Sequence, residues 1–379
     1  MTNEIKNRNR VHEPLFHITR ISQENKISKN KAWIVRGIAI LAALTVSALF
    51  AWIFFGVNPI NVCMSIVRGS FGTTRKIWVM LKDIALLLGV ALALTPAFKM
   101  RFWNIGGEGQ VLAGGLATVA CMFYLGGKIS EGLLLVIMLV AGVAAGAIWG
   151  LIPAVFKAVW NTNETLFTLM MNYIIIQLVR YFIGVWVPGG SNVLGIMTHG
   201  ELPKVMNEWL LVILIIGILT ALMYVYLKYS KQGYEISVVG ESERTARYAG
   251  INVKKVIIRT MIISGAICGL VGFLIVSAFD RSITVETAGG RGFTAIMVSW
   301  LGKFNPAFMA LTSFLIVFLE RGGSQMITDY NVSVAMPEII TAIILFFIIG
   351  CEFFLNYKII LNKKFIGKGK TEAVKEENK

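Results

Sequence analysis

The chain has 379 residues, of which 56% are hydrophobic and only 15% are charged, and its mean hydropathy is +0.70. This composition excludes an ordinary soluble domain and indicates a membrane protein. The formal net charge is +15, but no folded soluble domain is present to carry a basic face, so nucleic acid is excluded as a partner.

Three regions follow one another along the sequence. Residues 1–33 are polar and of mixed charge and are predicted to form a cytoplasmic N-terminal arm. Residues 34–357 form the predicted transmembrane domain. Residues 358–379 are rich in Lys and Glu and are predicted to be a disordered cytoplasmic tail. The first apolar run begins near Ile34 and is too long for a cleavable signal peptide.

The transmembrane domain is predicted to be an all-α, polytopic helix bundle of about ten spans. Its apolar runs are long enough to cross a hydrocarbon core of roughly 30 Å. In chain order the predicted spans are 37–57, 77–98, 105–126, 132–156, 165–187, 209–227, 260–279, 288–302, 304–320 and 336–356. The predicted spans 288–302 and 304–320 are short, which is typical of half-helices beside a translocation route.

The basic residues predict the orientation of this bundle. An even number of spans places both termini on one side, and 26 of the 36 Lys and Arg residues then fall in the cytoplasmic segments. This agreement with the positive-inside rule predicts cytoplasmic N- and C-termini. The basic tails are also suited to contact with anionic membrane lipid.

Polar residues inside the predicted spans mark a lined cavity or a paired interior contact. In the sequence FWNIGGEGQ, Asn104, Glu108 and Gln110 lie at the start of a span whose glycines permit irregular backbone. Glu108 is suited to hold two segments together by accepting backbone N–H bonds, and direct contact with a substrate is the alternative. Lys82 and Asp83 are expected to have partners on other helices, whereas Glu320 and Arg321 read as a solvated pair at a span end.

A second polar cluster begins at the entry to the span 165–187. Glu164, Thr168 and Asn172 are spaced by four residues, as are Tyr173 and Gln177, so a polar stripe is expected to face the bundle interior. Glycines are also ordered within spans. Those at 142, 146 and 150, and at 265, 269 and 272, are predicted to allow close helix packing.

The segment 231–251, KQGYEISVVGESERTARYAGI, is the longest charged and patterned interruption between apolar segments. Ser242 is predicted to cap a short helix that runs to Ala249, and Gly250 to end it in the left-handed conformation. The chain has no phosphate-binding loop of the G-x-x-x-x-G-K-[ST] type and no motif typical of catalysis. It is therefore expected not to be an enzyme and to bind no metal or cofactor.

Six motifs occur in order between residues 56 and 310: GVNPINV, GSFGTTRK, FWNIGGEGQ, NETLFTLMMNYI, YEISVVGESERTARYAGIN and GFTAIMVSWLGKFNP. With them the chain resembles permease subunits of bacterial ABC importers in the branched-chain amino acid and simple-sugar permease superfamily. Its motifs are most similar to the nucleoside branch, whose receptors are lipoproteins of the basic membrane protein type. The resemblance implies a multi-pass protein of the bacterial cytoplasmic membrane.

The resemblance also implies partners and sites. A separate ATP-binding subunit would hold ATP and Mg and dock on a cytoplasmic coupling loop, residues 229–255. A second homologous permease subunit and an extracellular substrate-binding lipoprotein complete the importer. The expected coupling residues are Tyr234, Val239, Gly240, Glu241, Ala246, Arg247 and Gly250. The expected translocation-path residues are Asn104, Glu108, Gln110, Asn172 and Phe293.

Other functions stay open from sequence. The substrate implied by the resemblance is a nucleoside, and a simple sugar such as ribose or galactose is the alternative. An ion-coupled secondary transporter would also be a glycine-rich bundle, but it has no need of a capped docking helix. A membrane-embedded enzyme is disfavoured because no acid–base or metal constellation is present.

Overall fold

The computed structural model describes residues 16–20, 29–187, 193–333 and 335–361, nearly all of them helical. The chain divides into a larger unit, Ile66–Gln325, and a smaller unit formed by Met1–Ser65 with Met326–Lys379. The boundary between the units falls inside two helices, α2 (Pro59–Phe71) and α12 (Pro306–Tyr330).

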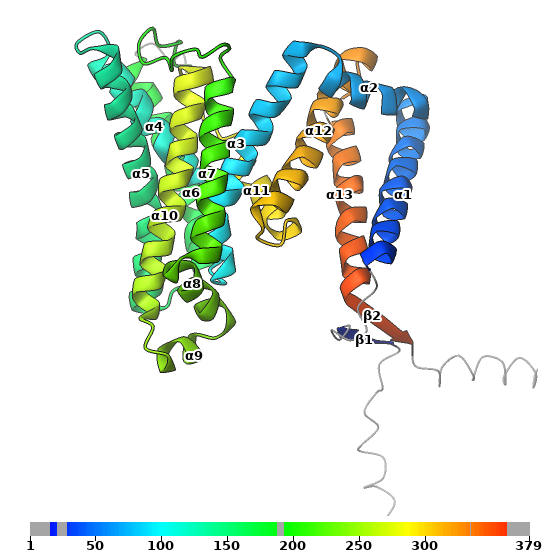
Figure 1. Ribbon diagram of the computed structural model, residues 1–379. Helices are drawn as coiled ribbons and strands as arrows, with labels where there is room; N and C mark the ends of the chain where they lie inside the picture. Colours follow the sequence, from blue (N-terminus) through cyan, green and yellow to red (C-terminus); the bar gives the residue numbers. More distant parts are fainter. Residues whose placement is uncertain (1–15, 21–28, 188–192, 334, 362–379) are drawn as a thin grey trace, which may run out of the picture. The chain divides into compact units, whose positions relative to one another are not determined.

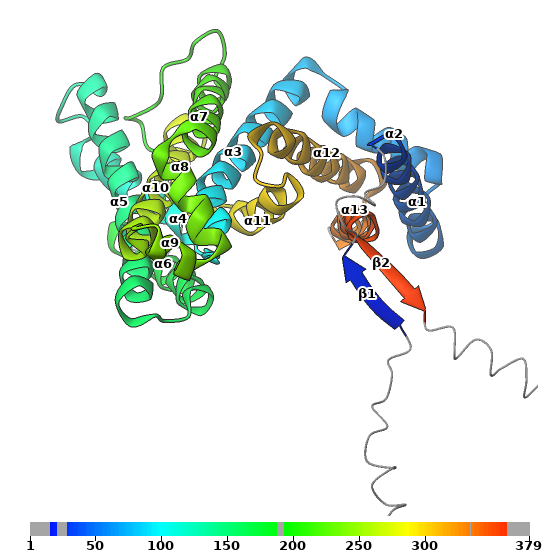
Figure 2. The same ribbon diagram turned by 60° about the horizontal axis from the view of Figure 1, so that its bottom comes forward.

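The larger unit is a bundle built around three well-buried helices, α3 (Thr74–Lys99), α4 (Gly107–Leu125) and α10 (Val253–Ile275) (Figure 1). Its other elements include α5 (Glu131–Trp160), α6 (Glu164–Trp186), α7 (Leu210–Tyr229), α8 (Lys231–Glu241), α9 (Glu243–Tyr248), the π-helical turn η3 (Val276–Asp280) and α11 (Arg291–Leu301). Helix α10 packs against α5, α4 and α3, and α3 packs in turn against α7 and α11. Figure 2 shows α10 and α4 lying between α5 and α3.

Glycine faces join α5 to α10. A Cβ atom at Gly146 would overlap the carbonyl oxygen of Gly265, and one at Gly269 would overlap the carbonyl oxygen of Gly142. The two backbones are therefore in direct contact, as the four-residue spacing predicts for helices that lack a hydrophobic drive to associate in lipid. Gly272 makes the same kind of contact with Val111 of α4 instead.

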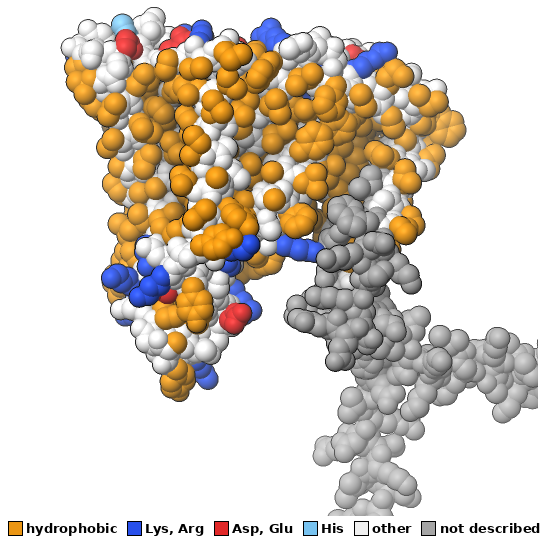
Figure 3. All heavy atoms as spheres, viewed as in Figure 1, with side chains coloured by type: hydrophobic (Ala, Val, Ile, Leu, Met, Phe, Trp, Pro, Cys, Tyr) orange, Lys and Arg blue, Asp and Glu red, His pale blue; other side chains and the backbone are white. Residues whose placement is uncertain are grey.

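The outer surface of the larger unit is apolar along its length. On the face shown in Figure 3, hydrophobic side chains cover its sides, whereas charged side chains gather at its two ends. On α7 the exposed apolar residues recur about once per turn: Leu214, Ile218, Leu222 and Val225. Such a stripe suits contact with lipid, and the chain is a multi-pass membrane protein.

In the described part of the chain, eight helices are long and apolar enough to cross a membrane: α1 (Lys29–Phe55, from Gly37), α3, α4, α5, α6, α7, α10 with η3, and α12. A shorter apolar stretch, Ala335–Cys351, lies in α13 (Ala335–Asn356). The polytopic helical fold is thus confirmed. The predicted span 288–302 is the 11-residue helix α11, a half-helix as expected. The predicted span 304–320 is present as α12, but its predicted short length is wrong because this helix has 25 residues and continues to Tyr330.

In the smaller unit, α1 packs against α13, and a two-stranded antiparallel ribbon lies at one end of them (Figure 1). Strand β1 (Phe16–Arg20) pairs with β2 (Tyr357–Leu361), with Phe16 opposite Leu361. Helix α1 begins at Lys29, inside the predicted arm, and β2 extends to Leu361, inside the predicted disordered tail, while the cytoplasmic place of both regions stays a prediction. The remainder of that tail, 362–379, and residues 1–15 and 21–28 lie outside the described residues.

The glycine contact between α5 and α10 gives a testable prediction. We expect Gly146→Ala to lower the stability of the purified chain by about 1–3 kcal/mol, because the new methyl group has no space between the two backbones. The matched control is Gly184→Ala in α6, where a Cβ atom meets nothing within 4 Å. Thermal unfolding in detergent measures both, and equal midpoints for the two variants would contradict the packing described here.

Candidate functional site

A non-helical segment, residues 100–106, separates α3 from α4, and side chains of α6 hold its backbone. Thr168 Oγ1 accepts a hydrogen bond from the Ile105 N–H (3.2 Å), and Asn172 Nδ2 donates to the Ile105 carbonyl oxygen (3.0 Å). Asn172 Oδ1 also accepts from the Gly109 N–H (2.9 Å) in the first turn of α4. The predicted inward stripe on α6 is confirmed at these two positions, and it binds irregular backbone that lipid could not satisfy.

The other part of the predicted α6 cluster points outward. Tyr173, Gln177 and Arg180 are exposed, and Arg180 Nη1 donates to Gln177 Oε1 (3.4 Å). Glu164, at the start of the stripe, forms an ion pair with Lys157 of α5 (2.9 Å). The prediction that the α6 polar residues face the bundle interior is therefore wrong for Tyr173 and Gln177, which lie on the opposite side of the helix from Thr168 and Asn172.

Asn104 and Gln110 form a closed amide pair in the core. Asn104 Nδ2 donates to Gln110 Oε1 (3.4 Å) and to Ser264 Oγ on α10 (3.2 Å), while Gln110 Nε2 donates to Asn104 Oδ1 (3.3 Å). All three side chains are fully buried. They tie the broken segment to α10, and their predicted place on a translocation route remains a prediction because none of them reaches a surface in this conformation.

Glu108 lies in the first turn of α4 and holds the start of α11. Its Oε1 accepts a hydrogen bond from the Gly290 N–H (2.8 Å) and its Oε2 accepts one from the Gly292 N–H (2.7 Å). A Cβ atom at Gly292 would overlap the backbone of Glu108, so the two helix ends are in contact. The prediction that Glu108 joins two segments through backbone N–H bonds is confirmed. Its contact with a substrate stays a prediction, as does that of Phe293, which follows on α11 and is 45% exposed.

Among the charged residues within the spans, the predicted Glu320–Arg321 pair is wrong. Arg321 does not form a solvated pair with Glu320, because α12 continues to Tyr330 and Arg321 Nε donates to Asp83 Oδ2 on α3 (2.6 Å). Lys82 Nζ lies 3.2 Å from Asp83 Oδ1 and 4.7 Å from the centre of the Phe279 ring. The expectation that Lys82 and Asp83 have partners on other helices is confirmed.

The segment after α7 folds into two short capped helices, α8 and α9. Ser230 Oγ accepts from the Gly233 N–H (2.9 Å), and Ser242 Oγ accepts from the Thr245 N–H (3.2 Å). Gly250, with φ of +76°, ends the segment. The predicted cap at Ser242 and stop at Gly250 are confirmed, although α9 itself ends at Tyr248, one residue earlier than predicted.

One face of the α8–α9 segment is built into the bundle. Ile236, Val239 and Ala246 are buried in a cluster with residues of α3, α5 and α10, among them Met261. A Cβ atom at Gly240 would overlap the carbonyl oxygen of Lys99, the last residue of α3. These contacts make the segment a rigid extension of three membrane helices.

The opposite face of this segment is free. Tyr234, Glu241, Arg247 and Gly250 are exposed, so four of the seven expected coupling residues are accessible to a partner. Val239, Gly240 and Ala246 instead face the bundle, where they support the segment. Sequence reasoning missed Tyr248, whose side chain is 93% exposed. Its position two residues after the buried Ala246 places it on the far side of the helix.

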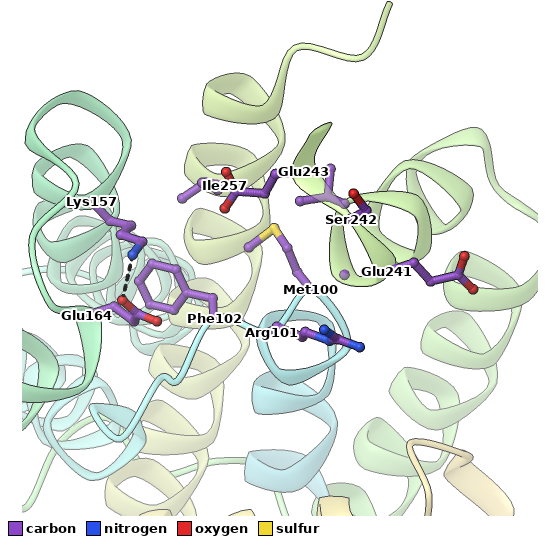
Figure 4. A pocket seen from close by; sticks show the side chains of 11 residues that line it. Met100, Arg101, Phe102, Lys157, Glu164, Glu241, Ser242, Glu243 and Ile257 are labelled. Carbon is purple, nitrogen blue, oxygen red and sulfur yellow. Dashed lines mark ion pairs between the residues drawn. The ribbon is translucent and has the colours of Figure 1, made fainter. Parts of the chain in front are cut away.

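A pocket of about 220 Å³ lies between the α8–α9 segment and residues 100–102 (Figure 4). Arg101 and Phe102 line it from the broken segment, and Glu241, Ser242 and Glu243 line it from the α8–α9 turn. Figure 4 shows the Lys157–Glu164 pair at its side. The pocket therefore separates the α8–α9 segment from the first residues of the broken segment 100–106, whose Ile105 backbone Thr168 and Asn172 hold.

At the other end of the larger unit, the described part of the loop after α6 is tied to η3 (Figure 1). The Leu202 N–H donates to the Ser277 carbonyl oxygen (3.0 Å), and Glu201 pairs with Arg281 (3.0 Å). A hydrogen bond from Lys204 holds the pKa of the Glu201 carboxyl below its usual range, and the Arg281 charge acts in the same direction. This loop caps the end of α10 that lies opposite the α8–α9 segment.

Among the described residues, no group of three or more His, Cys, Asp or Glu side chains is placed to hold a metal ion. The cysteines do not pair with one another in disulfides among the described residues: Cys63 is exposed, Cys121 is half-buried, and Cys268 and Cys351 are buried.

The sequence matches the protein family described as "Branched-chain amino acid transport system / permease component" over residues 77–349. It is 30% identical to the guanosine ABC transporter permease protein NupP of Bacillus subtilis, across 82% of this chain and 91% of that protein. It is 27% identical to the glucose ABC transporter permease protein TsgB13 of Haloferax volcanii (86% and 90% covered). It is also 27% identical to the nucleoside ABC transporter permease protein NupB of Lactococcus lactis (85% and 92% covered).

The role of Glu108 can be tested by substitution. We expect Glu108→Ala to lower both the yield and the thermal stability of the chain, because each of the two N–H groups it leaves unpaired costs about 1–3 kcal/mol. Glu108→Gln keeps one acceptor oxygen and should fall between Glu108→Ala and the wild type.

The matched control for this series is Glu286→Ala, at an exposed glutamate in the turn before α11. Thermal unfolding of the three variants in detergent is the measurement. If Glu108→Ala unfolds at the same temperature as Glu286→Ala, the carboxylate does not hold the two helix ends together.

Proposed function

Because the chain belongs to the family of branched-chain amino acid transport system permease components, we propose that it is the membrane-spanning subunit of an ATP-binding cassette importer that carries nucleosides. The family is one of ABC permeases, which work with an ATP-binding subunit and a substrate-binding protein. The chain itself is a transport subunit, and the hydrolysis of ATP, with its Mg, belongs to the partner.

The observation that carries this proposal is the two-sided construction of the α8–α9 segment. Its inner face is packed against α3, α5 and α10, and its outer face presents Tyr234, Glu241, Arg247 and Tyr248. An ion-coupled transporter has no use for such a face. A motor subunit docked there could move the ends of three membrane helices together, because the segment is rigidly joined to them.

The packed contacts offer a route by which this movement would reach the interior. Gly240 lies against the end of α3, after which the chain enters the broken segment that Asn172 holds. That segment leads directly into α4, and Glu108 at the start of α4 is bonded to the start of α11. Displacement of the α8–α9 segment would thus act on the paired ends of α4 and α11, where irregular backbone lines the interior.

The names of the relatives support the proposed substrate class. Guanosine, other nucleosides and glucose are the solutes in the names of the three permeases above, and each solute is neutral and carries several sugar hydroxyl groups. We assign a nucleoside because two of these three relatives are named for nucleosides. A simple sugar such as ribose or galactose is the second candidate, favoured by the glucose permease.

The remaining partners are proposed from the family and from position. A lipoprotein receptor would deliver the solute at the end of the larger unit that carries the loop 193–209, opposite the coupling segment. A second homologous permease subunit would complete the membrane part of the importer. Lipid would cover the apolar sides of the bundle.

The coupling role is tested by reversing charge on the free face of the segment. We expect Glu241→Lys with Arg247→Glu to leave folding and yield intact, because both side chains are exposed. ATP-driven uptake should fall by roughly tenfold or more, equivalent to ~1.4 kcal/mol or more of lost coupling. Uptake and ATP hydrolysis are measured in proteoliposomes that contain the complete importer.

Glu338→Lys, at an exposed glutamate of α13, serves as the control and should transport normally. Wild-type uptake by the double variant, in complex with a normally assembled ATPase, would rule out docking on this face.

A further inference from the structure

Six charged side chains gather within the membrane-spanning part of the larger unit, and the coupling mechanism above uses none of them. They come from α3, η3, α11 and α12, and they are Lys82, Asp83, Asp280, Arg291, Glu320 and Arg321. Asp83 is the centre of the group: Arg321 and Lys82 contact it as described above, and Arg291 Nη2 lies 3.6 Å from its Oδ1. Ionisable residues are costly at this depth, so their presence indicates a functional interior.

The formal charges of this cluster cancel, because three residues are acidic and three are basic. A neutral cluster exerts no net attraction on an anionic or a cationic solute. It still offers many directional donors and acceptors, since each guanidinium carries five N–H donors and each carboxylate two acceptor oxygens.

A cavity of about 140 Å³ opens beside the cluster, between α3, α11 and α12. Asp83, Arg291, Glu320 and Arg321 line it, together with Thr294 of α11 and the backbone of Gly289. At about 30 Å³ per water molecule, this volume corresponds to four or five waters. That is room for a small polar group with several hydroxyls rather than for an extended ligand.

One carboxylate oxygen in this wall takes part in ion pairs but accepts no hydrogen bond. Asp83 is 6% exposed, and its Oδ1 accepts no hydrogen bond from any described residue, although two cations lie nearby. Thr294 Oγ1 donates to the Gly290 carbonyl oxygen (3.2 Å) and keeps its own acceptor capacity. A hydroxyl group both donates and accepts, so it could donate to Asp83 while accepting from Arg291 or Arg321.

We propose that this cavity is a binding site for the sugar hydroxyl groups of the solute that the importer carries, with Asp83 and Thr294 as ligands to those hydroxyls. The inference rests on the nucleoside function proposed above and adds a site to it. The site also lies next to the start of α11, which Glu108 holds, so it would change shape when the ends of α4 and α11 move.

The test compares two solutes in proteoliposomes that contain the complete importer, its receptor and ATP. The probes are guanosine and 2′,3′-dideoxyguanosine, which differ only in two ribose hydroxyls, each at saturating receptor. The readout is the uptake rate of guanosine divided by that of 2′,3′-dideoxyguanosine. The receptor's own preference cancels because the same receptor serves the wild-type and variant permeases.

We expect Asp83→Asn and Thr294→Val each to lower this ratio by about tenfold. Each substitution removes one hydrogen bond between a solute hydroxyl and a polar side chain, and the loss of one such bond has an effect of about this size. Thr294→Val is nearly isosteric and leaves the ion-pair cluster intact. It therefore tests the site even if Asp83→Asn destabilises the protein. The matched control is Thr220→Val in α7, a threonine outside the cavity that makes the same type of bond to its own helix (2.7 Å to Ile216 O). It should leave the ratio unchanged.

The outcomes separate this inference from the function on which it rests. Equal slowing of both solutes, with an unchanged ratio in both variants, would mean that the cluster only holds helices together and would overturn the binding site alone. Absence of ATP-dependent guanosine uptake by the wild type would overturn the nucleoside proposal. If the wild type imports D-galactose instead, the same ratio is measured with 2-deoxy-D-galactose, and an unchanged ratio there would again overturn the site.

Discussion

The carboxylate of Glu108 is the contact on which the interior of the larger unit depends. It accepts two backbone N–H bonds at the start of α11 while it lies in the first turn of α4. Both helix starts have unpaired N–H groups and a partial positive charge, which an anion stabilises. Without this contact, the N–H groups at the start of the 11-residue helix α11 would lack a partner at membrane depth, as the broken segment before α4 would without Thr168 and Asn172.

Close backbone packing makes the rest of the bundle rigid, so that a displacement can reach the contact between α4 and α11. The glycine faces of α5 and α10 leave no space for side chains between them, and the same α10 extends from the α8–α9 segment to η3. A displacement at one end of such a helix is not absorbed by side-chain rearrangement along the way. The proposed coupling therefore needs no flexible relay, only a rigid segment and a pair of helix ends that can shift.

Local features of this structure could be predicted from sequence, since each depends on residues close together in the chain. The cap at Ser242, the stop at Gly250 and the inward direction of Thr168 and Asn172 follow from spacing and intrinsic preference. The bonds of Glu108 followed from the cost of leaving a carboxylate unpaired in a membrane protein. Its partner, the start of α11, was not identifiable from the sequence.

Long-range features could not be predicted in the same way. Arg321 lies 238 residues from Asp83, so the pair was not visible in the sequence, and the charges of α12 made that helix look shorter than it is. The division of the expected coupling residues between a buried face (Val239, Ala246) and an exposed face (Arg247) depends on tertiary packing against α3 and α10. The pairing of β1 with β2 joins segments from opposite ends of the chain, which local patterns do not connect.

In the importer proposed here, the free face of the α8–α9 segment lies in the cytoplasm and docks on a separate ATPase. The most direct test places a single cysteine at Tyr248, in a variant whose four native cysteines are replaced, and labels it with a membrane-impermeant maleimide. We expect no labelling in intact cells, labelling in inverted vesicles, and protection in those vesicles when the partner ATPase is bound. Labelling of that cysteine from outside intact cells would contradict it.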